Sequence, residues 1–273
     1  MTLQALAKVN LTLRVLDERG DGFHNIESLI VPISLADEVD VTITAGHGVR
    51  LRCDEPTIPC DQTNLAARAV LAFAEFTGKT FHAEIALRKR IPHGAGLGGG
   101  SSNAAAVLRG LDELLETRLS DGELLSLAAG LGSDVPFFIK SQSACCTGRG
   151  EILRPAHINP KWNLLLVKPP FAVPTGWAYQ SFARGGPWRP AASVSYDAVE
   201  LVNDLEPPVF DKYLQLPVLK AWLIRQPGVA TAMMSGSGST LFAVLTDEAP
   251  DLETQIARRF GETMWVHRCV TGG

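Results

Sequence analysis

The sequence lacks the segments that would place a protein in or across a membrane. No apolar run approaches the ~20 residues that span a bilayer. Lys8, Asn10 and Arg14 interrupt the N-terminal stretch, where a signal peptide would need an unbroken apolar core. We therefore expect a soluble cytoplasmic protein without a membrane partner.

Cysteine is also scarce, and an excess of positive charge is lacking. The 5 cysteines are an odd number without a C-x-x-C pair, which argues against a zinc site or a disulfide framework and predicts reduced thiols that act as small apolar fillers. The formal net charge of -4 argues against a generally basic nucleic-acid-binding surface and leaves a local basic cluster at Arg88, Lys89 and Arg90. The hydrolase and protease motifs G-x-S-x-G and H-E-x-x-H are absent as well.

The remaining composition is that of a well-packed protein of mixed structure. The 273 residues are 46% hydrophobic, which suits one large domain or two modest ones. Apolar residues alternate in some segments and recur at helical spacing in others in both halves, so the predicted fold class is α+β. Strands are expected around 9–15, 28–34, 38–44, 81–87, 164–167, 230–234, 241–245 and 264–270, and helices around 64–76, 104–115, 121–131, 197–205, 218–225 and 251–260. Ser120 and Glu123 form a capping box that opens the helix ending near Leu131.

Glycine is concentrated between Pro92 and Asn103, where the chain reads PHGAGLGGGSSN directly before a helical pattern. A backbone with so few side chains can approach another group closely, and a helix N-terminus attracts anions. We expect Ser101 and Ser102 to cap the first turn. The segment therefore predicts a polyphosphate-binding loop made of Pro92, His93, Gly94, Ala95, Gly96, Leu97, Gly98, Gly99, Gly100, Ser101 and Ser102.

Other phosphate loops fit this segment less well. A P-loop needs a lysine after the glycines, and none follows here. The dinucleotide pattern G-x-G-x-x-G matches at Gly94, Gly96 and Gly99, but the predicted strand ends too early, and Asp112 and Glu113 lie in the helix rather than at the end of a second strand. A dinucleotide-dependent oxidoreductase and a plain flexible turn remain the alternatives.

Three further segments could contribute to catalysis. Lys8 and Asn10 share the polar face of the first predicted strand, where a lysine is usually only solvated. Asp134 follows a helix break, where an aspartate is often only a cap or turn residue. The second glycine- and serine-rich segment, residues 234–240, could approach a ligand or form a plain turn. Together they would suit phosphoryl transfer, which needs a phosphate cradle, a divalent metal, a cation and a group at the acceptor hydroxyl.

The glycine-rich segment resembles the phosphate loop of the GHMP kinases. Other segments, at residues 7–11, 21–24, 132–137, 148–153, 203–206 and 235–239, resemble in the same order the branch of that family that phosphorylates the 2-hydroxyl of a cytidyl-diphosphate-linked methylerythritol in the non-mevalonate isoprenoid pathway. The resemblance implies a ribosomal-S5-like N-terminal domain over 1–157, a ferredoxin-like C-terminal domain over 158–273, and a site between them. It also implies ATP and Mg²⁺ as cofactors, and no nucleic-acid partner. We expect a monomer or weak homodimer.

The resemblance also implies roles for individual residues. Lys8 and Asp134 would be the catalytic pair, with Asp134 accepting or orienting the hydroxyl proton and Lys8 keeping Asp134 ionised while it offsets charge on the moving phosphoryl group. The glycine-rich segment would bind ATP. No residue is assigned to a metal.

Four residues would bind the substrate by the same resemblance. His24 would hydrogen-bond the cytosine and Asn10 would grip the substrate, while Phe23, where the family usually has tyrosine, would stack on the base opposite Tyr179. The alternatives are another GHMP kinase, which would lack an aromatic–histidine pair for a base, and a non-catalytic binding module, which would tolerate loss of Lys8 or Asp134.

Overall fold

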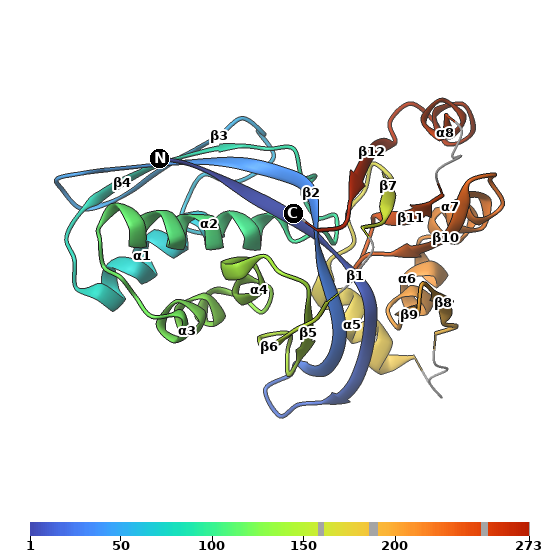
Figure 1. Cartoon of the computed structure of the whole chain (residues 1–273), viewed down its shortest axis with the longest axis horizontal. Coiled ribbons are helices and arrows are strands. Elements are labelled where there is room, and N and C mark those ends of the chain that lie inside the picture. The colour runs from blue at the N-terminus through green and yellow to red at the C-terminus, as the bar shows by residue number, and fades with distance from the viewer. Residues whose placement is uncertain (158–160, 186–190, 247–250, 273) are drawn as a thin grey trace. The chain divides into compact units, whose positions relative to one another are not determined.

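A computed structural model describes residues 1–157, 161–185, 191–246 and 251–272 of the chain. The chain forms two compact units, each made of several segments (Figure 1). The first unit takes in residues 1–7, 35–93 and 98–142, and the second takes in 8–34, 94–97 and the described residues from 143 onward. The expected domain boundary at 157/158 falls beside residues 158–160, which lie outside the described residues, and it stays a prediction.

The strands of the first unit form a sheet around β4 (His82–Arg88). The second half of β2 (His24–Thr44) pairs antiparallel with β4, and β3 (Gly48–Cys53) pairs parallel with it. The start of β1 (Thr2–Glu18) joins the other side of β2, where the Val41 amide donates to the Met1 carbonyl at 2.9 Å. β2 is one continuous strand, although the sequence pattern predicts two.

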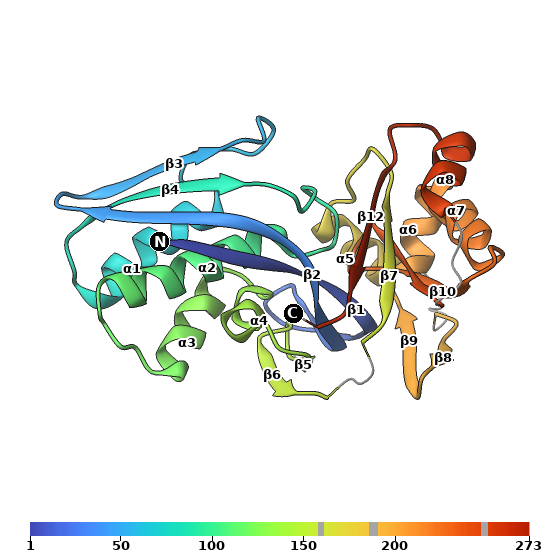
Figure 2. The ribbon, with the colours of Figure 1, turned by 45° about the horizontal axis from the view of Figure 1, so that its top comes forward.

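Four helices complete the first unit and lie on one side of β2, β3 and β4 (Figure 2). They are α1 (Leu65–Thr77), α2 (Gly99–Leu114), α3 (Asp121–Leu131) and α4 (Val135–Lys140). Asn64 caps α1, and Ser120 with Glu123 forms the capping box that the sequence predicts for α3. The N-termini of α1 and α3 lie where the sequence predicts them, because capping depends on residues no more than three positions apart.

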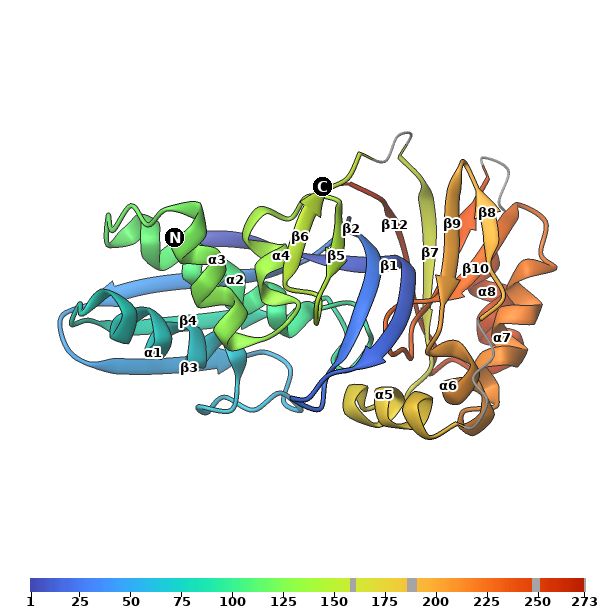
Figure 3. The same cartoon turned by 90° about the horizontal axis from the view of Figure 1, so that it is seen from below.

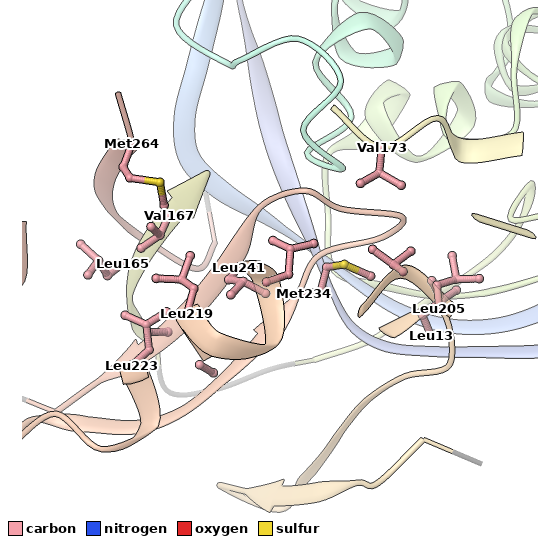
Figure 4. Packing of buried hydrophobic residues seen from close by; sticks show 14 of the residues in the cluster. Leu13, Leu165, Val167, Val173, Leu205, Leu219, Leu223, Met234, Leu241 and Met264 are labelled. Carbon is pink, nitrogen blue, oxygen red and sulfur yellow. The ribbon is translucent and has the colours of Figure 1, made fainter. Parts of the chain in front are cut away.

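The second unit contains an antiparallel sheet of strand order β10–β11–β7–β12. Its strands are β7 (Asn163–Lys168), β10 (Val229–Met234), β11 (Leu241–Leu245) and β12 (Trp265–Val270). The helices α6 (Glu206–Lys212), α7 (Gln215–Ile224) and α8 (Leu252–Phe260) lie on one side of this sheet (Figure 3), and α5 is Thr175–Arg184. Between sheet and helices lies a buried apolar cluster that includes Leu165, Val167, Leu219, Leu223 and Leu241 (Figure 4).

Two short hairpins attach to the long strands within the second unit. β5 (Ala144–Thr147) pairs with β2 and with β6 (Ile152–Pro155), while β9 (Val199–Asn203) pairs with β8 (Val194–Tyr196) and runs parallel to β1. The helix expected over 197–205 is therefore wrong. Asp197 and Ala198 form a turn with positive φ, and the next residues are held in a strand by pairing with β1, which local propensity cannot anticipate.

The α+β class is confirmed by this mixture of sheets and helices. Among the described residues, none of the helices is both long enough and apolar enough to cross a membrane. All five cysteines are free thiols. Cys146 and Cys269 are buried as fillers, but Cys60 and Cys145 are exposed, so the filler interpretation holds only for some of them.

Candidate active site

Lys8 and Asn10 are buried, each with 4% of its surface exposed, so the expectation of a solvated polar face is wrong. The Lys8 ammonium donates to Asn10 Oδ1 at 2.5 Å. Asn10 Nδ2 in turn donates to the Ser28 hydroxyl at 2.8 Å, and that hydroxyl donates to the Thr12 carbonyl at 2.6 Å. Charged groups are rarely buried without partners, so the burial of an ammonium marks this part of β1 as a candidate site.

A segment that we call the serine–glycine loop, residues 235–239, covers this face of β1. The Ser235 hydroxyl donates to the Gly96 carbonyl at 3.0 Å and accepts from the Asn10 amide at 3.4 Å. Gly236 has φ of 56°, and a Cβ at this position would lie 3.3 Å from Lys8 Nζ, from Asn10 Oδ1 and from the Gly96 carbonyl. The loop is thus more than a plain turn, because it lies against the lysine and the first glycine-rich segment.

The part of the glycine-rich segment that belongs to the second unit, residues 94–97, fits closely against its neighbours. The Lys8 amide donates to the Leu97 carbonyl at 3.0 Å. Gly96 has φ of 74°, and a Cβ there would collide with the Ser235 carbonyl and lie 3.0 Å from that of Gly238. Glycine at position 96 is therefore required by backbone packing, besides any contact with a ligand.

The N-terminus of α2, in the first unit, is opened by glycine rather than by serine. Gly98 is the N-cap and has the left-handed conformation, with φ of 74°. Among the described residues, no side chain forms a capping hydrogen bond at this end of α2. Ser101 and Ser102 lie inside the first turns, so the expectation that they cap the helix is wrong. Gly98 is the N-cap because glycine adopts a positive φ without strain. An N-terminus without a side-chain cap suits an anion.

A buried polar cluster behind this helix start is not predicted by any pattern in the sequence. Asp37 accepts from the amides of Arg90 and Ile91 at 2.8 and 2.9 Å, from Asn103 Nδ2 at 2.9 Å and from the Lys89 ammonium, which also donates to Asn103 Oδ1 at 2.9 Å. Lys89 is therefore part of an internal network rather than of a basic surface cluster. The network joins the residues before the glycine-rich segment to the first turns of α2.

Asp134 is the residue directly before α4, in the first unit. Its φ and ψ of -85° and -12° are helical, and its carboxylate does not cap α4. The residue is half-buried. The cap interpretation is thus not supported, and the catalytic role of Asp134 stays a prediction.

The residues expected to bind a base belong to the second unit. His24 is buried, and its ring stacks on Tyr179 with centroids 6.0 Å apart. Phe23 is 49% exposed, and the Arg149 guanidinium lies over its ring at 4.9 Å from the centroid. The structure thus brings His24 and Tyr179 together. It also places Arg149 against Phe23, a contact that the sequence indicates only through the position of Arg149 in the Gly-Arg-Gly-Glu motif.

A further segment of the second unit braces the serine–glycine loop. The Phe171 carbonyl accepts from the Ser239 hydroxyl at 2.6 Å and from the Lys168 ammonium at 3.0 Å, and the hydroxyls of Thr175 and Ser237 are 3.0 Å apart. Partial burial lowers the pKa of Lys168. Among the described residues, no cluster of three or more histidine, cysteine or carboxylate side chains could hold a metal ion.

Comparison with known proteins agrees with the resemblance seen in the sequence. Residues 64–142 match the GHMP kinases N terminal domain and residues 186–263 match the GHMP kinases C terminal domain. A 4-diphosphocytidyl-2-C-methyl-D-erythritol kinase of Methylacidiphilum infernorum is 41% identical over 96% of this chain and 93% of its own length. One of Geobacter metallireducens is 39% identical over 91% of this chain and 90% of its own length.

A solved structure gives the same result in three dimensions. The crystal structure of a 4-(cytidine 5'-diphospho)-2C-methyl-D-erythritol kinase is 34% identical, with a TM-score of 0.78, and the match covers 100% of both chains. The predicted two-domain GHMP kinase fold is confirmed. The chain belongs to the 4-diphosphocytidyl-2-C-methyl-D-erythritol kinase family of GHMP kinases.

Proposed function

We propose that this chain transfers the γ-phosphoryl group of ATP to the 2-hydroxyl of 4-diphosphocytidyl-2-C-methyl-D-erythritol, in the non-mevalonate route to isoprenoid precursors. The observation that carries the proposal is identity near 40% with kinases of that name over nearly the whole length of both chains. The buried lysine, the closely packed glycines and the α2 N-terminus without a side-chain cap are the features that phosphoryl transfer would use.

The phosphates of ATP would lie at the glycine-rich segment, residues 92–102. Its backbone amides, with the positive end of the α2 dipole, would hold anionic oxygens without competition from side chains. The left-handed conformations of Gly94, Gly96 and Gly98 support this role because they turn the backbone in a way that residues with a Cβ rarely do.

Lys8 and Asp134 would act on the reacting groups. The Lys8 ammonium would offset the charge of the transferred phosphoryl group, and its burial would strengthen that interaction, since water would screen it less. Asp134 would accept or orient the proton of the 2-hydroxyl, a contribution of ~10²–10⁴ in rate for a general base.

The cytidyl end of the substrate would be held by the aromatic residues. The half-exposed ring of Phe23 offers a stacking surface, and the buried His24 ring, stacked on Tyr179, offers a hydrogen-bonding edge for cytosine. The side-chain amide of Asn10 would bind the substrate nearer to its reacting hydroxyl. That Phe23 and Tyr179 enclose the base remains a prediction.

Mg²⁺ would accompany ATP. Mg²⁺ in phosphoryl-transfer sites is usually held by one or two carboxylates with phosphate oxygens and water, rather than by an all-protein cage. Among the described residues there is no cluster of three metal-ligating side chains, and we assign no residue of the chain to the ion. We also propose that the protein is cytoplasmic, in line with the cysteine usage of the sequence, and that it is a monomer or weak homodimer.

A substrate panel tests the proposed function. ATP consumption would be coupled to a spectroscopic readout with the cytidyl substrate beside mevalonate, homoserine and galactose, and we expect turnover with the cytidyl substrate alone. Preferred turnover of another alcohol would make the chain a different GHMP kinase. Binding of the cytidyl substrate without turnover of any alcohol would make it a non-catalytic binding module.

A further inference from the structure

Asn203 is a buried residue whose side chain is fully engaged by the backbone around the serine–glycine loop. It lies at the end of β9 with 1% of its surface exposed. Its Nδ2 donates to the carbonyls of Met234 and Gly236, at 2.7 and 2.8 Å, and its Oδ1 accepts from the Leu205 amide at 2.9 Å. Only an amide side chain supplies two donors and an acceptor in this arrangement.

The two carbonyls that Asn203 holds lie on either side of Ser235. Ser235 joins the loop to β1 and to the glycine-rich segment through its bonds with the Asn10 amide and the Gly96 carbonyl. Gly236 lies so close to Lys8 that a Cβ there would be 3.3 Å from the ammonium. One buried amide thus fixes the turn of backbone against which the lysine rests.

We propose that Asn203 is a positioning residue for Lys8, acting through the serine–glycine loop. A lysine ammonium on four rotatable bonds stays in one place only if its surroundings exclude the other rotamers, and here the loop forms one wall of those surroundings. A misplacement of about 1 Å at a reacting group can cost 10²-fold in rate. The inference rests on the proposed function only in assigning Lys8 to the reaction.

Glu206, in the same sequence motif, provides a matched control. It is buried like Asn203 and also binds Met234, accepting from the Met234 amide at 2.9 Å, while its other oxygen pairs with Lys220 at 2.6 Å. No described bond of Glu206 reaches residues 235–239. Glu206→Gln therefore removes a partly buried ion pair beside the same strand end without releasing the loop.

The test compares Asn203→Asp and Asn203→Ala with Glu206→Gln, at a temperature well below the melting temperature of every variant. We expect kcat to fall by about tenfold or more in both Asn203 variants, with KM for ATP changed less than about threefold. Glu206→Gln should lower the melting temperature about as much as the Asn203 variants do, but it should keep kcat within about twofold of wild type. A normal kcat in the Asn203 variants, or an equal loss in Glu206→Gln, would overturn the proposal.

A double variant separates positioning from general damage. If Asn203 acts through Lys8, adding Asn203→Asp to Lys8→Met should lower kcat by less than about twofold further, because the group being positioned is already gone. If the double variant instead loses kcat by the product of the two single-variant factors, Asn203 acts on a group other than Lys8. The proposed function itself is judged on the wild-type substrate panel, so its failure is seen before any variant is compared.

Discussion

Lys8 is buried where the strand pattern predicts an exposed side chain, and this changes what its removal should do. Lys8→Met should lower kcat by about 10²-fold or more, the usual effect of removing one electrostatic stabiliser. It should also lower the melting temperature by a few degrees, because the buried Asn10 Oδ1 loses its donor at a cost of ~1–3 kcal/mol.

Steady-state kinetics and thermal melting on the same sample measure both effects. Lys140→Met serves as a control, since Lys140 forms an exposed pair with Asp121 and should change neither quantity appreciably. A Lys8 variant that melts far lower and still turns over normally would make the lysine structural.

Asp134 is the second residue whose role can be isolated by a near-isosteric change. Asp134→Asn should nearly abolish turnover, because the amide cannot take the hydroxyl proton, while the affinity for an ATP analogue in calorimetric titration should change little. Asp121→Asn is the matched surface control. Retention of more than about a tenth of wild-type kcat would contradict the assignment, since acid–base groups normally contribute ~10²-fold or more.

Phe23 is too exposed to be a simple packing residue, with 49% of its surface accessible. Phe23→Ala should raise KM for the cytidyl substrate by about tenfold, since stacking of a base on an aromatic ring contributes ~1–3 kcal/mol. KM for ATP and the melting temperature should hardly change, and Phe23→Tyr should be neutral or mildly favourable. An unchanged KM for the cytidyl substrate in Phe23→Ala would remove the ring from the base site.

At the scale of elements, the two glycine-containing loops of the second unit are packed backbone against backbone. Gly96→Ala would drive a methyl group into the Ser235 carbonyl, from a left-handed conformation that alanine rarely adopts. We expect this variant to weaken ATP binding and to lower the melting temperature.

Gly130→Ala is the matched control for that change. Gly130 lies within α3, and a Cβ there would meet nothing within 4 Å, so the substitution should be neutral or slightly stabilising. Calorimetry with an ATP analogue and thermal melting compare the two variants. Wild-type affinity and stability in Gly96→Ala would show that the loops can separate without consequence.

Sequence patterns predict the elements well where the determinants are local. The capping box of α3 and the strand β11 are short-range features, and both occur where the patterns place them. The strand at 199–203 was missed because its conformation depends on pairing with β1, nearly two hundred residues away in the sequence. The serine cap expected for α2 is wrong because Gly98, with a positive φ, starts the helix earlier than the apolar spacing indicates.

At the scale of the whole molecule, the five free thiols report on the packing of both units. Cys60 and Cys145 are exposed and should react quickly with a thiol reagent at pH 8. Burial raises the pKa of Cys269 to about 12, so its thiol stays protonated and unreactive from pH 7 to pH 10 in the folded state.

In guanidinium chloride all five thiols should react, because unfolding returns each pKa toward ~8.5. Mass spectrometry of the labelled peptides identifies which residues have reacted. Fast labelling of Cys269 in the native protein would contradict the burial of this side chain on β12.

Two features can be read from neighbouring residues alone, the glycine-rich segment before a helix and the capping box of α3, because they follow from local backbone preferences and side-chain spacing. The ordered motifs add a resemblance to the GHMP kinases. The burial of Lys8, the binding of Lys89 and Asn103 by Asp37, and the hydrogen bond from Asn203 to the Gly236 carbonyl instead depend on the folded chain. Burial of a polar group depends on which distant segments cover it and supply its hydrogen bonds, and that information is absent from any short stretch of sequence.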